Sequence, residues 1–381
     1  MKTSIVTLLL AFVLAFPVTG RVARAADAAV VPQDRTAAVI VAYQRIGEDE
    51  YPAASIGQDN FSDHITELEK GGYKVMALPD VIAAFKAGAT LPPKTVVLTF
   101  DGGHRSVLEK AVPLLLKENL PFTVFVATEH MDRQAPEYIS WDELKKLASN
   151  KLVTIGLHPS SYGLLVESSA DEVKRQINNA RTSLRDKLGI EAKYFAYPSG
   201  EISAAYRDIV AASGFDAALG QQSGVAYAGS DLYALPRFVM TESYGDLDRF
   251  RMTVNALPLP VTDVEPKDPH LTTMKPAIGF TVDAALTSAL PHLACFVPGQ
   301  GKPQIQTIGK NRVEVRLEKD LENDRVRINC TLPGPMSEDG EEQRWRWFGM
   351  LLTVPQPQDE SASDDNDMPD GDTAPASGGG E

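Results

Sequence analysis

Between residues 37 and 219 the sequence alternates short apolar segments with amphipathic ones, and this alternation constrains the fold more than any other feature. The apolar segments are rich in β-branched residues and uninterrupted by charge, which is typical of strands buried on both faces. Each is followed by a segment of helical periodicity, several of which end at glycine. The predicted strands cover residues 37–43, 75–78, 95–100, 122–127, 153–157, 194–197 and 216–219. Repeated units of this kind indicate a parallel sheet covered by helices.

About seven such units predict an α/β fold built on a distorted (β/α) barrel. An open, doubly wound sheet is the alternative, because periodicity alone does not separate the two. Two helix starts carry a serine followed three residues later by a glutamate, Ser106 with Glu109 and Ser140 with Glu143, and both predict capping boxes. His64 falls among charged residues of a predicted helix over 61–70, so we expect it on the helix surface.

From about residue 256 the period of the pattern changes from helical to two. Residues 312–317 and 325–328 alternate polar and apolar side chains, which predicts a small antiparallel β-sandwich, immunoglobulin-like, over residues 256–355. Proline-rich stretches at 257–260 and 265–269 have the composition of a stiff linker. The chain has two cysteines, Cys295 and Cys330. We expect them to form a disulfide that contributes about 3–4 kcal/mol, with two buried free thiols as the alternative.

Both ends of the chain differ from the rest in composition. Residues 1–25 combine Lys2, an apolar run over 5–16 and a small-residue cleavage site at Ala23–Ala25, which is typical of a signal peptide. That run is short for a membrane anchor, the alternative reading, and no later segment is apolar enough to span. We therefore expect export across the inner membrane to the periplasm or the exterior, and a first domain over 26–255. Residues 356–381 are acidic and rich in Ser, Asp, Pro and Gly, so we expect disorder there.

The charge of the chain argues against a nucleic-acid partner. The formal net charge is −14, and the eight carboxylates of the C-terminal tail leave −6 for the remainder. Binding to phosphate backbones needs a basic surface, which this balance does not supply.

Polar residues follow four of the predicted strands. Gln44 follows the first strand, Asp101 the strand over 95–100, His158 the strand over 153–157, and Tyr197-Pro198 ends the strand that begins at 194. In parallel sheets and barrels the carboxyl ends of the strands lie on one face, and sites form there. The sequence therefore predicts that these side chains share one rim.

Several of these segments resemble motifs of the polysaccharide deacetylases, the NodB-homology carbohydrate esterases of family 4. Thr99-Phe100-Asp101-Gly102 resembles the family's Thr/Ser-Phe-Asp-Asp, and residues 195–200 resemble its Phe-Ala-Tyr-Pro-Tyr-Gly. Residues 140–144 and 231–238 resemble the segments before the histidine motif and at the domain's end. Residues 43–46 are similar to the Tyr-His-Arg-Ile that opens a permuted subgroup. The resemblance covers residues 37–238 and implies a NodB-type barrel, here followed by the C-terminal sandwich.

The resemblance also implies a chemistry. In the family a zinc-like divalent metal, held by an aspartate and two histidines, polarises the N-acetyl carbonyl of a polysaccharide or oligosaccharide. A carboxylate acts as base and a histidine as acid in hydrolysis of the C–N bond. By resemblance Asp101 is the base and His158 a metal ligand, while Tyr197, Pro198 and Arg237 contact the saccharide. Arg237 could instead orient Asp101 or pair with a surface carboxylate.

Three positions depart from the family pattern. Gly102 stands at the position of the aspartate ligand, Tyr162 at that of the second histidine ligand, and Gln44 at that of the acid. An amide cannot deliver a proton at neutral pH. His104 could replace a ligand by joining His158 and Asp101 in a His-His-carboxylate set. The alternative is that His104 is a solvated loop residue.

Two functions are consistent with these residues. The first is hydrolysis of N-acetyl groups on a polysaccharide, as the resemblance implies. The second is a non-catalytic carbohydrate-binding or scaffolding protein that keeps the saccharide groove and has lost the metal. The altered positions favour the second, since they remove two metal ligands and the acid from the same rim.

Overall fold

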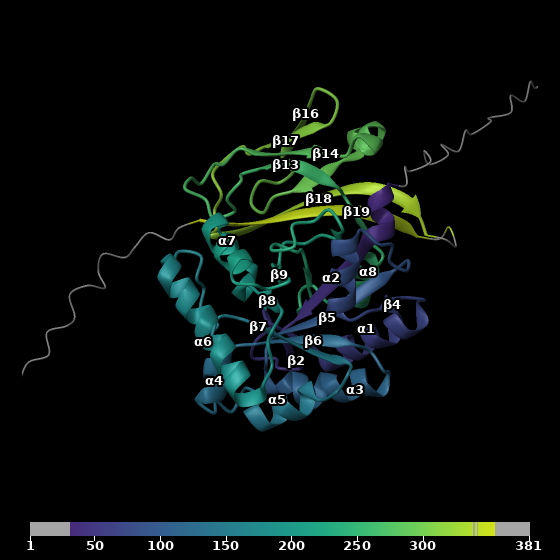
Figure 1. Ribbon diagram of the computed structural model, residues 1–381. Helices are drawn as coiled ribbons and strands as arrows, with labels where there is room; N and C mark the ends of the chain where they lie inside the picture. The colour runs from purple at the N-terminus through teal and green to yellow at the C-terminus, as the bar shows by residue number, and fades with distance from the viewer. Residues whose placement is uncertain (1–30, 338–339, 341, 355–381) are drawn as a thin grey trace, which may run out of the picture.

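The computed structural model describes residues 31–337, 340 and 342–354, and its largest element is a nine-stranded sheet (Figure 1). The predicted signal peptide and acidic tail lie outside the described residues. The strand order is β10-β1-β5-β6-β7-β8-β9, with β4 added beside β5 and β11 beside β1. The strands are β1 (Ala37–Tyr43), β4 (Lys74–Val75), β5 (Thr95–Gly102), β6 (Phe122–Val126), β7 (Val153–Leu157), β8 (Tyr194–Ala196), β9 (Ala217–Leu219), β10 (Ala226–Tyr227) and β11 (Phe238–Val239). All pair in parallel except β10 with β1, and the predicted distorted (β/α) barrel is confirmed.

The central strands are buried on both faces, as their unbroken apolar sequences predict. All eight residues of β5 are buried, with Val96 and Leu98 packing into one apolar cluster and Val97 into a second one. Helices and short strands connect the units: η1 (Pro32–Thr36), β2 (Arg45–Ile46), β3 (Ser55–Ile56), α1 (Gln58–Lys70), α2 (Leu78–Ala87), η2 (Val107–Ala111), α3 (Val112–Lys117), α4 (Thr128–Asp132), α5 (Trp141–Ala148), α6 (Ala170–Leu188), η3 (Pro198–Gly200), α7 (Ala204–Ala212) and α8 (Leu247–Val254). Among the described residues, no helix combines the length and the apolar character needed to cross a membrane.

Of the two predicted capping boxes, one is confirmed and one is wrong. At the start of α5, Ser140 Oγ accepts from the Glu143 amide at 3.3 Å, and Glu143 Oε2 accepts from the Ser140 amide at 2.7 Å. The helical segment at Ser106 instead begins as a π-helix, and Ser106 makes no capping bond. Its Oγ accepts from the Ile46 amide at 3.2 Å, so a tertiary contact uses the hydroxyl that local sequence assigns to the cap.

Replacement of Ser140 by alanine should lower the free energy of unfolding by about 1 kcal/mol, because the first turn of α5 loses its capping oxygen. Urea denaturation followed by circular dichroism measures this change. Ser62→Ala is the matched control, since Ser62 lies within α1 and its hydroxyl donates to the Gln58 carbonyl rather than capping a helix. Equal effects of the two substitutions would contradict a capping role for Ser140.

The C-terminal part forms the predicted β-sandwich from two four-stranded sheets, ordered β12-β19-β18-β15 and β13-β14-β17-β16. The strands are β12 (Leu257–Pro258), β13 (Val261–Glu265), β14 (Ile278–Val282), β15 (Ala294–Phe296), β16 (Gln304–Ile308), β17 (Arg312–Arg316), β18 (Arg325–Met336) and β19 (Gln343–Thr353), with the short helix η4 (Ala284–His292) before β15. The linker expected at 257–260 is partly wrong. Leu257 and Pro258 are buried and pair in parallel with β19.

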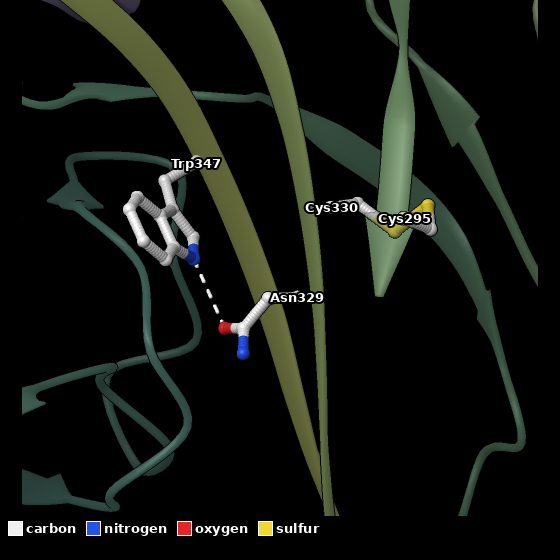
Figure 2. The surroundings of a disulfide bond; sticks show 4 residues. All are labelled: Cys295, Asn329, Cys330 and Trp347. Atoms are coloured by element: carbon white, nitrogen blue, oxygen red, sulfur yellow. Dashed lines mark hydrogen bonds between the residues drawn. A yellow bond between two sulfur atoms is a disulfide. The ribbon is translucent and has the colours of Figure 1, made fainter. Parts of the chain in front are cut away.

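The predicted disulfide is present and joins two neighbouring strands of one sheet (Figure 2). Cys295 on β15 lies directly opposite Cys330 on β18, with a Cα–Cα distance of 4.1 Å. The bridge therefore fastens the edge strand β15 to β18 rather than joining the two sheets. On the other side of β18, Asn329 Oδ1 accepts from the indole Nε1 of Trp347 at 3.0 Å.

The sheet that holds β18 and β19 lies between the barrel and the other sheet of the sandwich (Figure 1). Trp347 packs edge-on against Phe238 of the barrel, with ring centroids 5.2 Å apart. Gly349 approaches the barrel backbone so closely that a Cβ there would lie 2.2 Å from the Ser223 carbonyl oxygen. The buried Arg346 pairs with Asp34 of η1 through bonds of 2.6 and 2.8 Å. Strand β19 is thus packed onto the barrel along much of its length.

Candidate functional site

The carboxyl ends of the barrel strands border a polar cavity of about 390 Å³. Two of the predicted rim residues, Gln44 and Asp101, line it. Asp101 belongs to β5 itself, because this strand continues to Gly102, two residues beyond its predicted end. The volume falls within the range of roughly 300–1,000 Å³ that is usual for small-molecule sites. The cavity is therefore the candidate functional site.

Asp101 is buried and forms a two-pronged ion pair with the equally buried Arg237. Arg237 Nη1 donates to Oδ1 at 2.7 Å and Nη2 donates to Oδ2 at 2.8 Å. Two further bonds hold the guanidinium, from Nε to the Gly220 carbonyl and from Nη1 to Thr99 Oγ1. Burial by itself would raise the pKa of Asp101, but the Arg237 charge outweighs it and the pKa is lowered. Arg237 thus orients Asp101, one of the roles left open by the sequence.

His158 is buried beside Asp101, and its neighbours fix its tautomer. The Gly102 amide donates to Nε2 at 3.2 Å, so Nε2 is an acceptor. The proton therefore lies on Nδ1, which donates to the Ala196 carbonyl at 2.7 Å. Burial lowers the pKa of His158 to about 4, so the ring is neutral at pH 7. Nε2, which is 3.8 Å from Asp101 Oδ1, has its lone pair engaged by the backbone.

The ring of His104 occupies the space that a side chain at position 102 would need. A Cβ built on Gly102 would lie 2.6 Å from His104 Nε2 and 2.8 Å from Cδ2. The Gly102 backbone also has a φ of +93°, a conformation that favours glycine. The glycine at position 102 and the position of the His104 ring therefore depend on each other.

The expectation that His104 is solvated is wrong, because the side chain is 2% exposed. Its backbone forms a bridge to Tyr138, and its ring lies 4.7 Å from the Tyr138 ring, which in turn stacks on His130. His104 Nε2 lies 3.5 Å from the Gln44 amide nitrogen, and Nδ1 is buried without a hydrogen-bond partner among the described residues. Burial and the nearby Arg45 charge lower the pKa of His104 to about 3.

Tyr162 stands edge-on against His158, with ring centroids 4.7 Å apart. Its backbone is left-handed, with φ of +61°, and its amide donates to the Pro159 carbonyl at the close of a tight turn. Burial raises the pKa of the Tyr162 phenol, which keeps it protonated at neutral pH. A neutral phenol is a poor substitute for an imidazole ligand.

The predicted saccharide contacts Tyr197 and Pro198 lie in the barrel core rather than on the cavity wall. Tyr197 is fully buried, and its hydroxyl donates to the Tyr233 carbonyl at 2.9 Å. Arg237, the third predicted contact, has its guanidinium committed to Asp101, Thr99 and Gly220. Arg237 therefore positions Asp101 from outside the cavity, and Tyr197 belongs to the barrel core.

The residues around Asp101 do not fit the divalent metal that the resemblance implies. His158 Nε2 receives a backbone hydrogen bond, both Asp101 oxygens are held by Arg237, and the His104 ring occupies the space beside Gly102. In residues 31–337, 340 and 342–354, no group of three His, Cys, Asp or Glu side chains is placed to hold a metal ion. The ligand atoms of His158 and Asp101 that would face a metal are already engaged within the protein.

The prediction that His64 lies on the helix surface is wrong, because its side chain is buried. Its Nε2 donates to the Gly245 carbonyl at 2.8 Å, and its Nδ1 accepts from the Tyr43 hydroxyl at 3.0 Å. The ring also stacks on Phe250, with centroids 3.8 Å apart. His64 thus links α1 and α8 beneath Tyr43, the residue that precedes Gln44 at the cavity.

Sequence reasoning missed six polar residues that line the cavity: Gln221, Thr241, Ser243, Tyr244, Arg325 and Arg327. Gln221 Nε2 donates to Asp101 Oδ2 at 3.4 Å, and its Oε1 accepts from both arginines at 3.3 Å. The arginines come from β18 of the sandwich, so the cavity combines both parts of the chain. Their alternation with Val326 was the available signal, because it places both side chains on one face of a strand.

Comparison with known proteins confirms the resemblance found in the sequence. Residues 88–218 match the family model described as polysaccharide deacetylase. A poly-beta-1,6-N-acetyl-D-glucosamine N-deacetylase of Escherichia coli K12 is 22% identical over 216 residues, which cover 46% of this chain. That match spans 32% of the Escherichia coli protein, about a third of its length.

Solved structures of two deacetylase-type proteins share the fold. The deacetylase PplD of Streptococcus pyogenes, solved with acetate, aligns with a TM-score of 0.53 at 20% identity, covering 58% of this chain and 99% of that chain. IcaB from Ammonifex degensii aligns with a TM-score of 0.52 at 22% identity, covering 57% and 96%. The barrel of this chain is therefore of the same fold as theirs.

Proposed function

We propose that this chain, which carries a polysaccharide deacetylase-type domain, binds an N-acetylated polysaccharide or oligosaccharide in the rim cavity without hydrolysing it. The observation that carries this proposal is the His104 ring in the space of the missing ligand at Gly102. The composition of residues 1–25 supports export, so the saccharide would be met in the periplasm or outside the cell.

The remaining polar groups support binding better than catalysis. A general base needs a pKa near the working pH, whereas that of Asp101 is lowered and both its oxygens accept from Arg237. Gln44 can orient a sugar hydroxyl or an acetamido oxygen but has no proton to give to a departing amine. The cavity therefore keeps hydrogen-bonding groups and lacks an acid.

The rival function is hydrolysis of the C–N bond of N-acetyl groups to give acetate and a free amine. Asp101 on the cavity wall favours it, as do the relatives named for N-deacetylation. Hydrolysis requires that Asp101 or another group accept a proton from water while Arg237 remains paired with Asp101.

An assay on the purified mature protein separates the two functions. We expect N-acetylglucosamine oligosaccharides, β-1,4- and β-1,6-linked, to bind in calorimetry, and acetate release to stay at background with or without added zinc, cobalt or nickel. Acetate release that Asp101→Asn abolishes would establish the enzyme instead. Absence of binding to every N-acetylated oligosaccharide would refute the binding function.

A variant of the cavity mouth tests where the saccharide binds. Ala53 is exposed and lines the cavity, so Ala53→Trp should weaken binding at least tenfold by obstructing the entrance. Ala83→Trp is the matched control, because Ala83 is exposed on α2 and does not line the cavity. Equal affinities of the two variants would place the saccharide elsewhere.

A further inference from the structure

Two arginines of the sandwich face the cavity whose other wall is the barrel rim. Arg325 and Arg327 are alternate residues of β18, so their side chains leave the strand on the same face. Both line the cavity together with Asp101 and Gln44. The sandwich therefore contributes positive charge to a site that the barrel alone would leave without it.

Uncharged acceptors hold both guanidinium groups in place. Gln221 Oε1 accepts from Nη2 of each arginine at 3.3 Å, and the Gln221 carbonyl accepts from Arg327 Nε at 3.4 Å. Arg325 Nη2 also donates to the Ser199 carbonyl. These bonds fix the direction of the guanidinium groups but do not neutralise them.

The positive charge at this wall exceeds the negative charge. Arg325 forms an ion pair with Glu201, 3.5 Å from Nε, whereas within the described ranges no carboxylate lies within 4.0 Å of Arg327, so one positive charge is left over. Arg325 Nε is buried and has no hydrogen-bond partner among the described residues. Asp101 does not offset the excess, because Arg237 already pairs with both its oxygens. Burial and the Arg325 charge lower the pKa of Arg327 to about 10, which leaves it charged at neutral pH.

We infer that Arg325 and Arg327 form an oxyanion subsite, and that the saccharide bound in this cavity carries an acidic group, a carboxylate, sulfate or phosphate. Guanidinium groups match planar or tetrahedral oxyanions through paired N–H donors, and two of them around one cavity favour such a group over a hydroxyl. The sugar part of this inference rests on the proposed saccharide-binding function, whereas the anion part rests on the arginines alone.

The neighbouring wall suits the sugar that would carry the acidic group. Thr241, Ser243 and Tyr244, which carry hydroxyl groups, also line the cavity. Ala54 and Met240 add apolar surface. A sugar ring with its acidic substituent toward β18 would meet both kinds of surface.

A comparison of two oligosaccharides of equal length tests the subsite. One is a chito-oligosaccharide, and the other alternates N-acetylglucosamine with glucuronate. We expect the acidic one to bind at least tenfold more tightly at low salt, and 0.5 M sodium chloride to remove most of this preference. Arg327→Gln should abolish the preference and Arg327→Lys should keep part of it. Arg316→Gln, at an exposed position at the end of β17, should leave it unchanged.

The outcomes distinguish the two proposals. Equal binding of both oligosaccharides by the wild type, with no effect of Arg327→Gln, would overturn the oxyanion subsite and leave saccharide binding intact. If neither oligosaccharide binds, the proposed function fails, and methyl glucuronide, glucose 6-sulfate and glucose 6-phosphate then test the subsite alone. Protection of the wild type against thermal unfolding by one of them supports the subsite and identifies the acid, and protection by none overturns it. If Arg327→Gln does not fold, the wild-type preference and its salt dependence decide.

Discussion

Replacement of Arg237 by methionine should lower the free energy of unfolding by about 3–5 kcal/mol, because it leaves Asp101 buried without its partner. Both side chains are fully buried, and the pair is joined by bonds of 2.7 and 2.8 Å. Methionine fills much of the arginine's volume, so the loss reflects charge rather than a cavity. Denaturant unfolding followed by tryptophan fluorescence measures it.

The pH dependence of stability gives a second readout of the same pair. In the wild type the pKa of Asp101 is below its unfolded value, so its contribution is present above about pH 4 and is lost as pH falls further. In Arg237→Met, burial remains and the arginine charge is gone, which raises the pKa above the unfolded value. The variant should therefore become more stable as pH falls from 7 to 5, where the wild-type contribution of Asp101 is flat.

Two controls keep this prediction specific. Asp101→Asn combined with Arg237→Met should recover about half of the loss or more, since the unpaired buried charge is removed. Arg133→Met breaks an exposed pair with Glu129 on α4 and should change stability by less than about 1 kcal/mol. An Arg237→Met effect no larger than that of Arg133→Met would show that the buried pair is energetically unimportant.

Restoration of the family's aspartate by Gly102→Asp should destabilise the protein by about 2–4 kcal/mol and should not create a metal site. The new Cβ would lie 2.6 Å from His104 Nε2, and the backbone φ of +93° is unfavourable for any L side chain. His158 Nε2 would still accept the Gly102 amide, and Tyr162 would still lack an imidazole. Unfolding experiments with and without zinc measure both expectations.

Gly189→Asp separates the two causes of that destabilisation, which are the clash with the His104 ring and the positive φ of the backbone. Gly189 has a φ of +69°, and a Cβ there meets nothing within 4 Å. Its replacement should therefore lower the free energy of unfolding by about 1 kcal/mol, through the unfavourable backbone conformation alone. Addition of His104→Ala to Gly102→Asp should recover the difference between the two glycine variants. Stoichiometric zinc binding by Gly102→Asp without loss of stability would mean that the His104 ring moves aside readily, and would contradict the packing argument.

Local sequence predicted the parts of this molecule that depend on local interactions. β1 and β7 have the predicted bounds, since runs such as Ala37–Tyr43 admit one interpretation. The capping box at Ser140 and the pairing of Cys295 with Cys330 were also predicted. Ser106 and His64 were predicted wrongly, because contacts with residues distant in sequence, Ile46 and Gly245, decide where their polar atoms point.

The members of the candidate site were predicted only in part, since Gln44 and Asp101 line the cavity and Tyr197 and Pro198 do not. The departures from the family pattern at Gly102, Tyr162 and Gln44 were visible in the sequence, whereas the contact between Gly102 and the His104 ring depends on the tertiary fold. No periodicity indicates that β18 faces the barrel rim, so Arg325 and Arg327 could not be assigned to the cavity. Arg237 had several possible partners, and burial selects Asp101 among them.

The packing of β19 onto the barrel bears on how the chain reaches its native state. Asp34 lies near the start of the described chain and its partner Arg346 near the end, so this salt bridge forms only after strand β19 has been synthesised. A nascent barrel released without β19 would expose Phe238 to solvent and leave Asp34 without its cation. We therefore expect the two structural parts to fold as a single cooperative unit. Truncation after α8 should give an aggregation-prone fragment rather than a minimal domain.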